Sequence, residues 1–265
     1  MSLTPYAESH GAAVYHCPWQ GLLEVVPRCD LICVDAPYSP RVHAGHFAGS
    51  QDADDATKDW LARKGYDDKR TRRRPLPYGS WSAEDVGAFV GAWAPRCEGW
   101  MVSITDHVLA PAWEAAMRDA GRYTFAPLPF LEVGKQPRLT GDGPASWTCW
   151  IIVSRPKTRA FSTWGSLPGG YSTQNKDQNR IPGGKPLWLM HRLIEDYSRS
   201  DGLVIDPCCG GGTTLVAAIR AGRRAIGGDI SEERAALAAQ WIRNPHLPPP
   251  GQEATPNGEG QQALF

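Results

Sequence analysis

The feature that most constrains the fold is a glycine-rich turn near the C-terminus, set between an apolar strand and a helix. The strand covers 203–205, the turn reads Asp206-Pro-Cys-Cys-Gly-Gly-Gly212, and the helix covers 213–221. A further strand over 224–229 ends on an acidic residue. Glycine lets backbone approach a ligand closely, and the first helical turn has N–H groups free for an anion. This unit predicts a doubly wound α/β fold with a ligand at the turn.

The rest of the chain alternates between apolar runs and amphipathic segments. Ser82 followed by Asp85 is a capping pattern that predicts the start of a helix. Apolar runs without alternation suit strands buried on both faces of a parallel sheet. We therefore expect an α/β fold with a doubly wound, mostly parallel, Rossmann-like sheet. The expected strands are 12–17, 31–34, 100–104, 123–133 (broken by prolines) and 147–153, and the expected helices are 19–26, 82–93, 108–120, 186–198 and 232–242.

The domain organisation follows from length and composition. The 265 residues, 42% hydrophobic and 21% charged, suit one α/β domain over 1–243, with an inserted loop at about 43–78. The Pro-, Gly- and Gln-rich stretch 244–265 predicts a disordered tail. No apolar run is long enough for a bilayer, and no signal peptide is evident, so we expect a cytoplasmic protein. Seven scattered cysteines fit a reducing compartment and show no metal-site spacing.

A basic block lies inside the predicted insertion, although the formal net charge of the chain is zero. Five cations occupy six consecutive positions: Lys69, Arg70, Arg72, Arg73 and Arg74. Such a block can contact nucleic-acid phosphates. A solvated loop is the equally good alternative, and the charge alone does not decide between them.

The details of the glycine turn favour one class of cofactor over another. NAD and S-adenosylmethionine share this strand–turn–helix geometry, but Leu215 stands where a dinucleotide fingerprint has its third glycine. Asp206 just before the turn would repel a pyrophosphate and suits a cationic amino-acid group. Asp229, roughly 20 positions beyond the first glycines, suits hydrogen bonds to ribose hydroxyls. These residues favour S-adenosylmethionine, with a purely structural turn as the alternative.

A second loop, Asp35-Ala36-Pro37-Tyr38, follows a buried strand. An exocyclic amine on a nucleobase is a poor nucleophile because its lone pair is delocalised into the ring. A carboxylate that accepts one of its hydrogens helps to localise that pair and to aim it. Pro37 stiffens the loop, and Tyr38 suits stacking on a base taken out of the duplex. Such a tetrapeptide alone is more often an ordinary turn, so its weight comes from the glycine loop.

Together, the two loops resemble the beta-class amino methyltransferases of bacteria and their phages. In that family a D-P-P-Y motif precedes D-P-F-x-G-x-G-T, a circularly permuted order, and Lys185-Pro186 resembles its K-P motif. The resemblance covers about 14–242 with a weak middle, and implies a methyltransferase sheet. It implies catalytic roles for Asp35, Pro37 and Tyr38. The cofactor-binding residues that it implies are Lys185, Pro186, Asp206, Pro207, Cys208, Gly210, Gly212, Thr213 and Asp229.

Two departures from the family pattern stand out. Ala36 replaces the first proline of the catalytic motif, which predicts a less rigid loop. His16-Cys17 stands where the family has Gly-Asp, which leaves the contact to the cofactor adenine unassigned.

The inserted loops 43–78 and 161–180 are the candidates for recognition of double-stranded DNA.

The resemblance implies methylation of an exocyclic DNA amine, with adenine N6 favoured because the catalytic loop begins with aspartate. Cytosine N4 methylation and an inactive module that binds S-adenosylmethionine and DNA stay open as alternatives. A cytosine-C5 enzyme would need Pro207-Cys208 in its catalytic loop, but this pair lies in the cofactor turn. RNA and protein-glutamine methyltransferases usually place the glycine motif first, which the order here opposes.

The last residues form a separate motif. Gln261, Leu264 and Phe265 match the Q-L-x-L-F peptide with which bacterial replication proteins bind the sliding clamp, and Gln262 departs from it. The sequence therefore predicts clamp docking as one role for the tail. An incidental terminus, or one that folds back on the domain, is the alternative.

Overall fold

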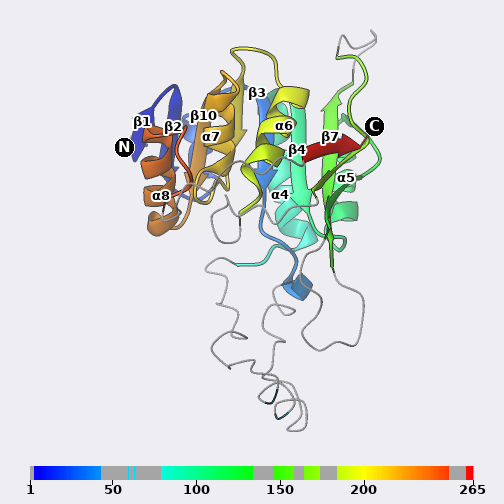
Figure 1. Ribbon diagram of the computed structural model, residues 1–265. Helices are drawn as coiled ribbons and strands as arrows, with labels where there is room; N and C mark the ends of the chain where they lie inside the picture. Colours follow the sequence, from blue (N-terminus) through cyan, green and yellow to red (C-terminus); the bar gives the residue numbers. More distant parts are fainter. Residues whose placement is uncertain are drawn as a thin grey trace.

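The computed structural model is a single sheet with helices on both faces (Figure 1). It describes residues 3–42, 59, 63, 79–133, 146–157, 164–173, 184–250 and, for the backbone only, 261–264. The predicted basic block at 69–74 lies outside these residues, as does Phe265. Nearly all of the predicted insertion at 43–78 also lies outside them.

Five parallel strands form the centre of the sheet. Their side chains are mostly buried on both faces, as expected for apolar runs without alternation. Neighbouring strands run in the same direction, with Leu31 opposite Val204 in one pair. The carboxyl ends of these strands therefore lie at the same edge of the sheet. In spatial order the strands are β2 (Ala12–His16), β10 (Arg224–Asp229), β9 (Leu203–Asp206), β3 (Cys29–Asp35) and β4 (Cys97–Thr105).

The flanks of the sheet are largely antiparallel, so "mostly parallel" describes its centre alone. The pair β6–β8 is the parallel exception among the described flanking strands. The sequence missed β1 and β8, which have three and four residues and are too short to carry a pattern. The flanking strands are β1 (Ala7–Ser9), β5 (Arg122–Thr124), β6 (Leu128–Glu132), β7 (Thr148–Pro156), β8 (Gly170–Thr173) and β11 (Gln261–Leu264).

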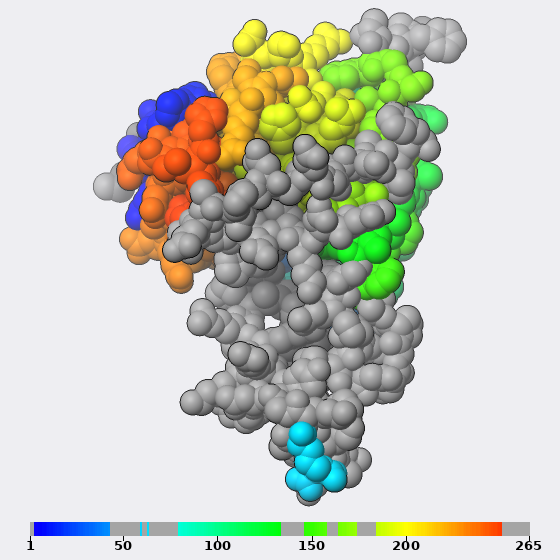
Figure 2. Space-filling view, viewed as in Figure 1, coloured from blue at the N-terminus to red at the C-terminus, as the bar shows by residue number. Residues whose placement is uncertain are grey.

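The helices divide the core into two layers, as a doubly wound fold requires. One apolar cluster lies under α6 (Leu187–Tyr197), α7 (Thr213–Arg220) and α8 (Glu232–Arg243), which stand side by side in Figure 1. The other cluster lies under α4 (Ala83–Trp93) and α5 (Ala110–Asp119). In Figure 2 the N-terminal residues (blue) lie beside α8 (orange), in agreement with the contact between α8 and β1.

Local signals explain where helices form and where one does not. The predicted capping box is confirmed: the Ser82 side chain accepts from the Asp85 N–H, and the Asp85 carboxylate accepts from the Ser82 N–H. The expected helix at 19–26 is instead a single 3₁₀ turn, η1 (Gly21–Glu24). Pro27 comes directly after the predicted range 19–26, and a proline disfavours helical backbone in the residue before it.

The C-terminal segment differs from the expected disordered tail at one place. The backbone of β11 pairs antiparallel with β8, with Leu264 opposite Gly170. In the described part of the chain, no helix is long and apolar enough to cross a membrane.

Candidate active site

A cavity of about 490 Å³ opens at the carboxyl ends of the parallel strands, where ligands bind in open α/β sheets. Its volume lies within the range of about 300–1,000 Å³ typical of small-molecule sites. Asp35 and Pro37 line it together with seven predicted cofactor residues, namely Lys185, Asp206, Pro207, Cys208, Gly210, Thr213 and Asp229. The structure therefore brings the two predicted loops to one cavity.

Three predicted site residues lie just outside the lining. Gly212 is the N-cap of α7 with φ of +90°, and an added Cβ would lie 2.9 Å from the Cα of Ala238. Only glycine fits this left-handed, crowded position. Pro186 is the N-cap of α6, and Tyr38 flanks the cavity next to Lys185.

The glycine turn is fastened by hydrogen bonds within its own β9–α7–β10 unit. The N–H of Cys208 donates to Oδ1 of Asp206 at 3.1 Å, and the N–H of Gly210 donates to Oδ2 of Asp229 at 2.9 Å. The other oxygen of Asp229 accepts from the N–H of Ser231 at 2.8 Å. These bonds fix the conformation of the turn, whose residues line the cavity.

Asp206 is the most deeply buried acid in the cavity, with 1% of its surface exposed. The Thr214 hydroxyl donates to its Oδ2 at 2.5 Å. Burial raises the pKa of Asp206 to about 7; the bonds from Thr214 and Cys208 oppose this shift, and the nearby carboxylates of Asp35 and Asp229 add to it. A buried carboxylate of this kind favours a cationic ligand, which would stabilise its charged form.

The charges around the cavity sum to a negative environment. Four carboxylates face two cations in the lining: Asp35, Asp85, Asp206 and Asp229 against Lys185 and Arg234. An anionic pyrophosphate would be repelled by this excess, whereas a ligand with a net positive charge is attracted.

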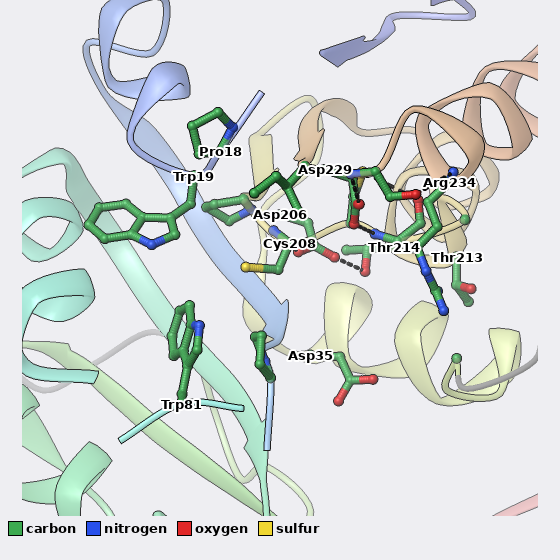
Figure 3. A pocket seen from close by; sticks show the side chains of 18 of the residues that line it. Pro18, Trp19, Asp35, Trp81, Asp206, Cys208, Thr213, Thr214, Asp229 and Arg234 are labelled. Carbon is green, nitrogen blue, oxygen red and sulfur yellow. Dashed lines mark hydrogen bonds between the residues drawn. The ribbon is translucent and has the colours of Figure 1, made fainter. Parts of the chain in front are cut away.

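One end of the cavity is aromatic, and the sequence did not predict it. Trp19, from the loop after β2, and Trp81, just before α4, stand at this end, while Arg234 and Thr213 stand at the other (Figure 3). The Trp81 ring stacks on that of Trp113 at 6.2 Å between centroids. Their positions in the sequence could have indicated this role, because the loops that follow parallel strands all lie at the same edge of the sheet.

The predicted catalytic loop is held by residues far away in the sequence. The N–H of Ser39 donates to the buried carboxylate of Asp106 at 2.7 Å, and the carbonyl of Tyr38 accepts from the N–H of Trp81 at 3.0 Å. Ala36, 3% exposed, packs in the apolar cluster under α4 and α5. Packing and these bonds restrain the loop at Ala36, where the family has the first proline of its motif. Asp106 was missed, since nothing in its local sequence marks it.

Lys185 contacts the catalytic loop as well as the cofactor cavity. Its Nζ lies 2.7 Å and 2.8 Å from the two carboxylate oxygens of Asp35, and 4.8 Å from the centre of the Tyr38 ring. Burial lowers the pKa of Lys185, but nearby negative charges, led by Asp35, outweigh burial and leave it above its usual value. The lysine is therefore a charged partner of Asp35.

Comparison with known families gives the site its context. The family model for DNA methylases, of the N6/N4 class, matches residues 77–240, more than half of the chain. The chain belongs to this DNA methylase family. Among curated proteins, a putative methylase, YubD, from Escherichia coli (strain K12) is 40% identical over 67 residues. That match covers 25% of this chain and 30% of the relative's length.

Solved DNA methyltransferases show the same fold. M1.HpyAVI in complex with SAM has a TM-score of 0.61 at 15% identity, covering 88% of this chain and 99% of that one. A putative DNA modification methylase from Thermus thermophilus has a TM-score of 0.55 at 20% identity, covering 90% and 96%. The cytosine-N4-specific PvuII DNA methyltransferase has a TM-score of 0.59 at 14% identity, covering 91% and 90%.

The residues of this DNA methylase fit S-adenosylmethionine as its cofactor. The methionine part carries an ammonium and a carboxylate, and the cavity offers Asp206 for the first and Arg234 for the second. The sulfonium charge suits the excess of carboxylates. His16 and Cys17 do not line the cavity: His16 contacts the carbonyl of Ile230 at 3.1 Å, and Cys17 is buried.

Proposed function

We propose that this DNA methylase transfers a methyl group from S-adenosylmethionine to the exocyclic amine of a DNA base, with adenine N6 as the favoured target. The observation that carries the proposal is the shared cavity: Asp35 and the glycine turn, about 170 residues apart, line it together. A methyl donor and an amine held at these two loops would lie next to each other.

The glycine turn and α8 would hold the methionine part of the cofactor. Asp206 would bind the ammonium, and Arg234, with the N-terminus of α7 at Thr213, would bind the carboxylate. Bound there, S-adenosylmethionine supplies an electrophilic methyl group on a positively charged sulfur.

The aromatic end of the cavity would hold the cofactor adenine. Trp19 and Trp81 offer flat apolar surfaces there. Asp85, in the first turn of α4 shortly after Trp81, also lines the cavity and would offer its carboxylate to the adenine amino group. Hydrogen bonds from Ser82 lower the pKa of Asp85, so this acceptor stays ionised. Asp229 would accept from the ribose hydroxyls. This arrangement replaces the family contact that His16-Cys17 cannot supply.

The catalytic loop would prepare the amine. Asp35 would accept one N–H of the base, localise the nitrogen lone pair and take up the proton that the nitrogen loses. Pro37 would fix the direction of the loop, and Tyr38 would stack on the extruded base. These roles for Asp35, Pro37 and Tyr38 and the assignment of the chain to the beta class are parts of the same proposal.

Cytosine N4 is the second candidate target, because the same loop serves both amines. An inactive module that binds S-adenosylmethionine and DNA is the non-enzymatic alternative. Mass spectrometry of nucleosides from cells that express the protein distinguishes the three: N6-methyladenine, N4-methylcytosine or neither. Asp35→Ala is the control, and sequencing of modified positions then gives the recognition sequence. Cofactor binding without any modified base would overturn the proposed enzymatic activity.

DNA binding through the basic block is a separate proposal, since these residues lie outside the described part of the chain. Neutralising Arg72, Arg73 and Arg74 should weaken binding and reduce the slope of log K against log salt by about 3. Binding measured at several salt concentrations tests this. An unchanged slope would show that the block does not contact phosphates.

Clamp docking through Gln261, Leu264 and Phe265 also stays a proposal. The pairing of β11 with β8 supports the alternative, a terminus that folds back on the domain. A sliding clamp would have to compete with this pairing. Equal clamp binding by the full chain and by one that lacks its last five residues would exclude the docking proposal.

A further inference from the structure

An ion pair in the site joins the proposed catalytic carboxylate, Asp35, to a residue from a distant segment. Lys185 reaches Asp35 across 150 positions of sequence and binds both carboxylate oxygens, at 2.7 Å and 2.8 Å. The lysine side chain is 10% exposed and that of Asp35 is 21% exposed. This is a partly buried, bidentate contact, unlike a surface pair that salt and water would screen.

The ammonium of Lys185 lies where the proposed reaction would place the amine of the base. A nitrogen that donates to Asp35 and stacks over Tyr38 is what the proposed reaction needs from the base. The Nζ of Lys185 already donates to Asp35 and lies 4.8 Å from the centre of the Tyr38 ring. A nucleobase stacked on that face of the ring would meet the lysine.

The lysine and a reacting amine cannot share this place during methyl transfer. The amine nitrogen gains positive charge as it gains the methyl group, and a second cation within hydrogen-bond distance of the same carboxylate opposes that charge. The ammonium also neutralises the carboxylate that should localise the lone pair. Lys185 must therefore withdraw before the reaction.

A second carboxylate acts on Lys185 from another part of the sheet. Glu132, at the end of β6 and 6% exposed, contributes to the raised pKa of Lys185, as does Cys149 on β7. Both strands lie on the flank of the sheet, away from the cofactor turn. The lysine thus has a second acidic group in its surroundings, and this group belongs to the flank of the sheet and not to the cofactor turn.

We propose that Lys185 is a built-in occupant of the amine site, which holds Asp35 and covers Tyr38 until an unpaired base displaces it. This rests on the proposed function, because it assigns the amine site to Asp35 and Tyr38. Lys185 is then a positioning residue that holds the catalytic carboxylate and lowers the affinity of the site for a base, because a base must displace it.

The test is a binding measurement that does not depend on catalysis. The full-length protein, without a methyl donor, is titrated against a single-stranded oligodeoxyadenylate and an abasic oligonucleotide of equal length. The abasic strand reports phosphate contacts alone. We expect Lys185→Met to raise the ratio of oligodeoxyadenylate to abasic affinity about fivefold, because the base no longer competes with an ion pair. Lys185→Arg keeps the charge and should stay within about twofold of the wild-type ratio.

A double-mutant cycle separates competition from simple loss of bulk. In the Asp35→Asn background, Lys185→Met should produce no further gain, because no charged carboxylate remains to hold the lysine. Thermal melts confirm that each variant folds, and Lys185→Gln serves as a second neutral variant. An unchanged or lower ratio for both neutral variants, or an equal gain in the Asp35→Asn background, would overturn the proposal.

The outcome is distinguishable from failure of the proposed function. A wild-type protein that methylates no DNA would remove the proposed activity, while a raised affinity ratio would still place Lys185 in the base site. The same titration with oligodeoxycytidylate shows which base gains. A gain with either base supports the inference, and its identity indicates the target amine.

Discussion

The glycine turn and the catalytic loop occupy the same cavity but are held in different ways. In the turn, the polar contacts of Asp206 reach Cys208 and Thr214, two and eight positions away. In the catalytic loop, the partners lie much farther along the chain: Asp106 is 67 positions from Ser39, and Lys185 is 150 from Asp35. The first is a self-contained unit, whereas the second depends on the whole fold.

Removal of the Asp35 carboxylate, the proposed general base, should have the largest effect and should leave the turn intact. We expect Asp35→Ala to lower kcat by about 10³-fold, the scale of a lost general base and amine acceptor. Cofactor affinity should change by less than about threefold, because the turn is fastened within its own unit. Calorimetry with S-adenosylmethionine and single-turnover methylation measure the two effects. A parallel loss of cofactor binding would show that the two regions are coupled.

A substitution inside the turn should instead lower the free energy of unfolding. Gly212→Ala forces a side chain into a left-handed residue, 2.9 Å from Ala238. We expect a loss of about 2–4 kcal/mol from strain and overpacking. Gly222→Ala is the matched control: its φ is +73°, but nothing lies within 4 Å of an added Cβ. That variant should lose only about 1 kcal/mol in urea unfolding; equal losses would mean that crowding at Ala238 does not matter.

The same contrast explains what the sequence could predict. The strand, turn and helix around Asp206 were predicted correctly because their signals are local: an apolar run, glycines and a helix start. Trp19, Trp81 and Asp106 were missed because their roles arise only when separate strand ends meet. Lys185 was expected beside the cofactor, and its contact with Asp35 is a product of tertiary packing.

The charge of Asp206 should make the stability of the cofactor-free protein depend on pH. The folded pKa, about 7, lies above the usual value of 3.8, so the folded state binds the extra proton between these values. Stability from this group is complete below about pH 4 and is lost as the pH rises toward 7. We expect the wild type to be more stable at about pH 5 than at about pH 8, by about 2 kcal/mol. Asp206→Asn should remove this difference, and chemical unfolding at both pH values tests it.

The smallest expected effect concerns Asp85, which has a structural and a proposed ligand role at once. Its carboxylate accepts from the N–H and the hydroxyl of Ser82, both at 2.8 Å, and Asp85 also lines the cavity. Ser82→Ala removes the capping hydroxyl and leaves the carboxylate, while Asp85→Ala removes both functions. Each should cost about 1 kcal/mol of stability through the cap of α4.

Cofactor affinity then separates the two roles of Asp85. Asp85→Ala should weaken S-adenosylmethionine binding by about fivefold to tenfold, the value of one solvent-exposed hydrogen bond of about 1 kcal/mol, whereas Ser82→Ala should change it by less than about twofold. Equal affinities in the two variants would reduce Asp85 to a helix cap. The contact to the cofactor adenine would then have to come from Trp19 and Trp81 alone. Aromatic rings, and not a carboxylate, would in that case replace the family's contact at the position of His16-Cys17.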